Sequence, residues 1–63
     1  MSDLFDNIKD LPQSVQMAIA EFERRKDVID GYENCRILEI ELNKLGFSFE
    51  WGLDAVPFDL KTN

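Results

Sequence analysis

The sequence predicts an α+β fold in which two antiparallel helices are followed by a C-terminal β-hairpin. Two observations predict this order: apolar residues first recur at helical spacing in two segments, and then alternate with polar residues in two shorter ones. The helices are predicted at about residues 12–26 and 30–45, and the strands at about 47–51 and 56–60. With 63 residues in total, the chain has room for a single small domain with a thin core.

The first predicted helix follows a short N-terminal segment, residues 1–10, which we expect to be helical or irregular. Pro12 suits the first turn of a helix, where its missing N–H costs nothing. The apolar residues of this helix fall on one stripe: Val15, Ala18, Ile19 and Phe22. The basic run at residues 24–26 then favours the negative end of the helix dipole. The helix is therefore expected to be amphipathic, with one buried face.

The second helix is predicted to begin at an Asp30-Gly31 break, with Asp30 as its N-cap. A single helix running through Gly31 is the alternative, because helical spacing continues from Val28. The second helix is apolar on two faces. Its main stripe contains Tyr32, Cys35, Leu38, Leu42 and Leu45, and nearly opposite lie Ile37 and Ile40. The second face therefore needs a separate cover, and Gly46 is expected to end the helix.

The predicted hairpin supplies that cover. With residues 52–55 as its loop, all six apolar side chains of the strands share one face. The predicted facing pairs are Trp51 with Val56, Phe49 with Phe58, and Phe47 with Leu60. We expect this face to lie over Ile37 and Ile40, and residues 61–63 to form a frayed tail.

A homodimer is predicted from the two edges of the hairpin. Pro57 cannot donate to a strand ladder, so residues 56–60 should pair poorly with a further strand. The other edge is free of proline and is the candidate dimer contact, comprising Phe47, Ser48, Phe49, Glu50 and Trp51. A single Cys35 and the absence of histidine exclude an internal disulfide and the usual zinc ligands, which leaves self-association to support a thin core.

The residues available for chemistry predict a protein that is not an enzyme. Cys35 lies on an apolar stripe, and no histidine exists to activate it or a serine hydroxyl. The three glycines are far apart and make no phosphate-binding loop. We therefore expect no catalytic residue, cofactor or metal ion.

The charge and the start of the chain predict where it acts. Thirteen acidic and seven basic residues give a net charge of −6, spread over both halves, which disfavours direct binding to nucleic acids or membranes and favours a basic protein partner. The opening MSDLFDNIKD lacks the basic and apolar regions of a signal peptide, and the longest apolar run is four residues. These features predict a cytoplasmic protein.

The leading functional hypothesis is a small acidic protein–protein interaction or regulatory module. Six side chains are the candidate partner contacts: Met17, Glu21, Glu33, Glu41, Leu53 and Asp54. The alternative is an acidic inhibitor that mimics nucleic-acid charge and occupies the basic groove of a DNA-binding protein or nuclease. A mimic needs carboxylates in rows at phosphate-like spacing, whereas an interaction module needs an apolar centre.

Overall fold

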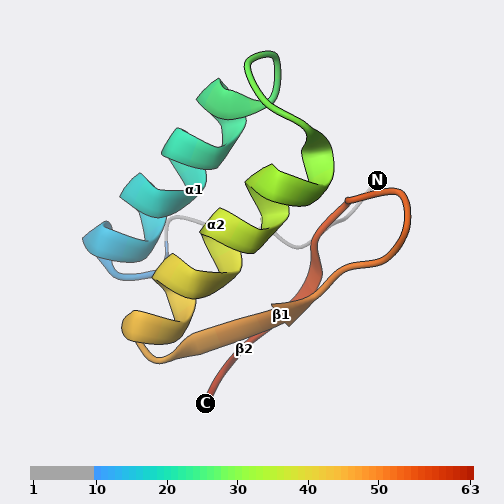
Figure 1. Ribbon diagram of the computed structural model, residues 1–63. Coiled ribbons are helices and arrows are strands. Elements are labelled where there is room, and N and C mark those ends of the chain that lie inside the picture. The colour runs from blue at the N-terminus through green and yellow to red at the C-terminus, as the bar shows by residue number, and fades with distance from the viewer. Residues whose placement is uncertain (1–9) are drawn as a thin grey trace.

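The computed structural model describes residues 10–63 and contains two helices followed by a two-stranded antiparallel sheet (Figure 1). The elements are α1 (Gln13–Arg25), α2 (Gly31–Lys44), β1 (Phe47–Glu50) and β2 (Phe58–Thr62). The helices lie side by side in opposite directions, and the hairpin runs back along α2 (Figure 1). The predicted α+β fold is confirmed. Of the predicted N-terminal segment, residues 1–9 lie outside the described part of the chain.

Helix α1 forms where its sequence predicts. The Gln16 amide donates to the carbonyl of Pro12 at 3.0 Å, which closes the first turn. The four residues of its predicted stripe, Val15, Ala18, Ile19 and Phe22, are the buried residues of the helix. Its end tightens into a shorter-range bond from the Lys26 amide to the carbonyl of Glu23.

The break between the helices is confirmed, and a single helix running through Gly31 is wrong. The side chain of Asp30 accepts a hydrogen bond from the Tyr32 amide at 3.0 Å, as an N-cap does. Gly31 also has a packing role, because a Cβ added there would lie 3.1 Å from the Cβ of Ala55 in the hairpin loop. At its C-terminal end, α2 is followed by Leu45 and then by Gly46, which has a φ of +92°. This left-handed conformation favours glycine and ends the helix, as the sequence predicts.

The register of the hairpin differs from the prediction. The observed pairs are Phe47 with Thr62, Ser48 with Lys61, and Glu50 with Phe58, which leaves a seven-residue loop at 51–57. The loop is longer than predicted and β2 begins two residues later. The pairs that the sequence predicted are therefore wrong. The chain end is also not frayed, since Lys61 and Thr62 belong to β2 and the Asn63 amide donates to the Gly46 carbonyl.

A β-bulge in β2 explains why the alternation was misleading. One residue separates Ser48 from Glu50, but two residues separate their partners Lys61 and Phe58. Asp59, one of the two residues between Phe58 and Lys61, has a φ of +62°. An extra residue reverses which face the side chains beyond it occupy. Leu60 accordingly packs against the core, whereas Phe58 is 51% exposed.

The same reversal affects the loop residues before Phe58. Val56 is exposed, and Pro57 is buried and precedes β2 instead of lying within the strand. The six apolar side chains of the predicted hairpin therefore do not share one face.

The core lies between the helices and β1. Its buried members are Val15, Ala18, Ile19, Phe22, Cys35, Leu38, Leu42 and Phe49. The hairpin approaches α2 on the side of Tyr32 and Glu39, where the Trp51 ring meets Tyr32 edge-on at 5.7 Å and its Nε1 donates to Glu39 at 3.3 Å. The expectation that the hairpin covers Ile37 and Ile40 is wrong, because Ile40 is 54% exposed and Ile37 is half-buried.

A buried asparagine joins the end of α1 to α2. Asn34 is 1% exposed, and its amide nitrogen donates to the carbonyl of Phe22 at 2.9 Å. Its amide oxygen accepts from Nε of Arg25 at 2.7 Å. Asn34 thus links the last turn of α1 to α2 through two hydrogen bonds of a buried side chain.

Candidate functional site

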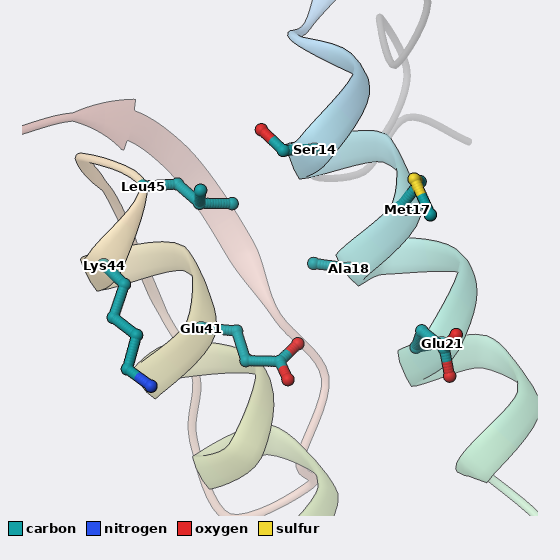
Figure 2. A pocket seen from close by; sticks show the side chains of 7 residues that line it. All are labelled: Ser14, Met17, Ala18, Glu21, Glu41, Lys44 and Leu45. Carbon is teal, nitrogen blue, oxygen red and sulfur yellow. The ribbon is translucent and has the colours of Figure 1, made fainter.

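The candidate site is a groove between α1 and α2 with a volume of about 400 Å³ (Figure 2). We call it the α1/α2 groove. Its walls are Ser14, Met17, Ala18 and Glu21 from α1, and Glu41, Lys44 and Leu45 from the C-terminal end of α2. Figure 2 shows Ser14, Ala18, Glu41 and Leu45 directed towards the space between the two helices, with Met17 and Lys44 lying to either side of it.

The groove lies where α1 presents small side chains to the C-terminal end of α2. Ser14 and Ala18 are four residues apart and so lie one above the other on the helix surface. Both side chains are too small to fill the space opposite Leu45. The small-residue row on α1 therefore leaves the two helices incompletely packed at this end.

The groove carries apolar surface that water reaches. Met17 is 58% exposed at its rim, and Leu45 at its end is exposed as well. Methionine is flexible and polarizable, so Met17 can adapt its shape to a contacting surface. A groove with such walls is suited to an apolar side chain from another molecule.

Two carboxylates give the groove its charge. Glu21 is exposed and paired with Arg24 on its own helix at 2.8 Å. Glu41 is half-buried, and among the described residues it has no ion pair or side-chain hydrogen bond. Figure 2 shows its carboxylate directed across the groove towards α1, while the Lys44 side chain does not cross it. Among the described residues, Glu41 therefore offers a carboxylate without an ion pair beside apolar surface.

The structure brings together three of the six predicted partner contacts. Met17, Glu21 and Glu41 all line the α1/α2 groove. Leu53 is 89% exposed, and it lies with Asp54 in the loop that packs near the start of α2, away from the groove (Figure 1). Glu33 is exposed in the first turn of α2. These last three residues do not form a common site with the groove.

Sequence reasoning missed the other walls of the groove. Ala18 and Leu45 belong to the predicted apolar stripes of the helices, and Ser14 and Lys44 are not among the predicted contacts. The signal that identifies them is the spacing of Ser14 and Ala18, because two small residues four apart leave a gap on one side of a helix. That signal becomes specific only when the facing element is known to be the end of α2.

The predicted dimer edge belongs to β1 and the residue after it. In the described part of the chain, β1 pairs only with β2, so its other edge has no strand partner. Phe49 is buried and Phe47 packs against the core, so a second strand at this edge would be held by backbone hydrogen bonds and not by these two rings. The reason expected for an asymmetry between the two edges does not hold. Pro57 lies outside β2, and β2 carries a bulge instead.

Cys35 is a core residue in this structure. Its side chain is fully buried, and Sγ donates to the carbonyl of Ala55 at 3.2 Å. Burial raises the pKa of the Cys35 thiol, and the negative charges of Asp54 and Glu39 raise it further. A thiol held in its protonated form is a poor nucleophile.

The described part of the chain shows neither a metal site nor a membrane-spanning helix, and the chain has no match among known proteins. Within residues 10–63, no group of three or more histidine, cysteine or acidic side chains is placed to hold a metal ion. The helices in this same part of the chain are too short or too polar to cross a bilayer. No protein-family model, curated protein or solved structure matches the chain.

Proposed function

We propose that the protein is a small acidic cytoplasmic interaction module, without catalytic activity, that binds another protein through the α1/α2 groove. The observation that carries the proposal is the combination of exposed apolar walls with the unpaired carboxylate of Glu41. Interfaces between proteins typically have an apolar centre with polar groups at its rim. The groove has this composition on a small scale.

The absence of catalysis is supported by the chemistry of the side chains near the groove. Ser14 is the one hydroxyl group in its lining, and the ionisable groups beside it are Glu21, Glu41 and Lys44. A serine nucleophile needs a base within hydrogen-bond reach and a third group to orient that base. No hydrogen bond of the Ser14 side chain occurs among the described residues, so this arrangement favours binding over reaction.

A homodimer formed through β1 is part of the proposal. The unpaired edge of β1 offers backbone donors and acceptors to a second strand, and two such edges related by a two-fold axis would make a four-stranded sheet. The bulge and the charged residues Asp59 and Lys61 make β2 a poorer edge. Sedimentation of the protein as a monomer alone at high micromolar concentration would refute this part.

The alternative function, a mimic of nucleic-acid charge, has less support. Several carboxylates are engaged by the protein's own cations, including Glu21 with Arg24, Glu23 with Lys26, and Glu50 with Lys61. Such pairs reduce the negative potential available to a basic groove. The carboxylate of Glu41, which forms no ion pair among the described residues, lies beside apolar surface instead of in a row of carboxylates.

The proposal is tested by quantitative affinity capture from cell lysate at low salt. Tagged wild-type protein is compared with Met17→Ser, which removes exposed apolar surface from the groove, and with Asp27→Asn, an exposed change in the turn between the helices. We expect a protein captured by the wild type and by Asp27→Asn to be lost with Met17→Ser. Capture that is equal for all three, or no specific capture at all, would count against the groove as the binding site.

A further inference from the structure

We infer that the occupant of the α1/α2 groove is a basic amphipathic helix of a partner protein. This inference rests on the proposed function, because it names the class of partner for the same groove. It follows from the shape of the groove, from the position of Glu41 within it, and from the charge of the whole chain.

The shape of the groove suits a third helix. Its two walls are the sides of neighbouring helices, and the α1 wall includes the small side chains of Ser14 and Ala18 (Figure 2). A helix that lies in a groove inserts apolar side chains spaced three or four residues apart. The space of about 400 Å³ opposite Leu45 would accept such side chains, and Met17 would close over them.

The position of Glu41 favours a partner helix that carries a positive charge next to its row of apolar side chains. Glu41 is half-buried with its carboxylate directed across the groove, and within residues 10–63 no cation forms an ion pair with it. Docking an uncharged or acidic helix would bury this carboxylate further without a partner, which is unfavourable. A lysine or arginine beside the apolar stripe would instead form an ion pair that is shielded from salt more than a surface pair is.

The charge of the whole chain distinguishes a foreign partner from a second copy. The net charge of −6 attracts a basic partner over a distance and repels another molecule of the same protein. The unpaired edge of β1 has no charged group of its own except Glu50. A dimer at β1 would have to form against this repulsion through backbone hydrogen bonds, whereas a basic partner in the groove would be attracted.

The experiment uses fluorescence anisotropy with two labelled helical peptides. Both carry leucines at helical spacing, and the flanking positions are lysine in one and glutamate in the other. They are titrated with the full-length protein and with Glu41→Gln, Met17→Ser and Asp27→Asn. Asp27→Asn changes the net charge by the same amount as Glu41→Gln but lies outside the groove. Circular dichroism confirms that each variant is folded.

We expect the lysine peptide to bind more tightly than the glutamate peptide, with affinity that falls as salt is raised to about 0.15 M. Glu41→Gln should lower the affinity of the protein for the lysine peptide about fivefold and should not lower its affinity for the glutamate peptide. Met17→Ser should lower the affinity for the lysine peptide about tenfold, because it removes apolar surface that the bound peptide would cover. Asp27→Asn should have no effect beyond that of net charge.

Three results would overturn the inference. If Met17→Ser weakens both peptides and Glu41→Gln acts no more strongly than Asp27→Asn, the groove binds helices but does not select basic ones, and the proposed function stands. If neither groove variant changes binding, the groove is not the site, and both proposals fail. If sedimentation shows self-association that Met17→Ser abolishes, the occupant of the groove is a second copy.

Discussion

Replacement of Asn34 by alanine should destabilise the protein far more than its position on a helix suggests. The side chain donates to the Phe22 carbonyl at 2.9 Å and accepts from Arg25 at 2.7 Å, and it is 1% exposed. Asn34→Ala removes this buried hydrogen bond at the end of α1, and the loss of one partner of a buried polar pair costs about 1–3 kcal/mol. It also removes the partner of Arg25 Nε.

The loss at Arg25 adds to this cost by a smaller amount. The Nη2 atom of Arg25 is already buried without a hydrogen-bond partner in the described part of the chain. The residue is only half-buried, however, so its guanidinium can turn towards water when Asn34 is absent. We expect a total loss of about 2–4 kcal/mol, against a free energy of unfolding of about 3–9 kcal/mol for a chain of this length.

Asn43→Ala is the matched control for this change. Asn43 lies in the same helix and is exposed, so the same substitution there removes no buried hydrogen bond. Both variants gain the same helix propensity, about 0.5 kcal/mol, which cancels in the comparison. The assay is urea unfolding followed by Trp51 fluorescence and circular dichroism. Free energies of unfolding that agree within about 0.5 kcal/mol for the two variants would refute the role assigned to Asn34.

Two further predictions concern the hairpin and the thiol. Phe49→Ala should lower the free energy of unfolding by about 3–4 kcal/mol, and Phe58→Ala by about 1 kcal/mol or less, because Phe49 is buried and Phe58 is half exposed. The measurement is urea unfolding, and equal losses for the two variants would contradict the bulged register. Cys35 should react with a thiol reagent far more slowly in the folded protein than in urea. Since folding raises the pKa of Cys35 above its ordinary 9.0, its contribution to stability is complete below pH 9 and declines as the pH rises through the folded value. A difference in stability between wild type and Cys35→Ser that stays constant as the pH rises above 9 would show that the thiol pKa is not raised.

The sequence predicted the helices well because their signals are local. The stripe of α1 repeats over several turns, and the cap at Asp30 is formed by residues two apart. The hairpin was misplaced because its register depends on one residue, Asp59, in a left-handed conformation. Glycine at this position would have indicated a bulge, whereas aspartate adopts that conformation only as an exception.

The candidate site was predicted in part for a related reason. Met17 and Glu41 stood out because they lie off the buried stripes of their own helices. Whether they face the same space depends on how α1 and α2 are rotated against each other, which the sequence of either helix does not specify. Leu53 was conspicuous for a different reason, its exposure at a loop tip, and the structure leaves it apart from the groove.

The most direct test of the central claim is to map the binding surface by nuclear magnetic resonance with isotope-labelled protein and the lysine peptide. We predict that the largest amide shift changes occur along the α1/α2 groove, at Met17, Ala18 and Glu41, with little change in the loop around Leu53. Changes confined to that loop or to the exposed face at Phe58, with the groove unaffected, would contradict the claim that the groove is the site of binding.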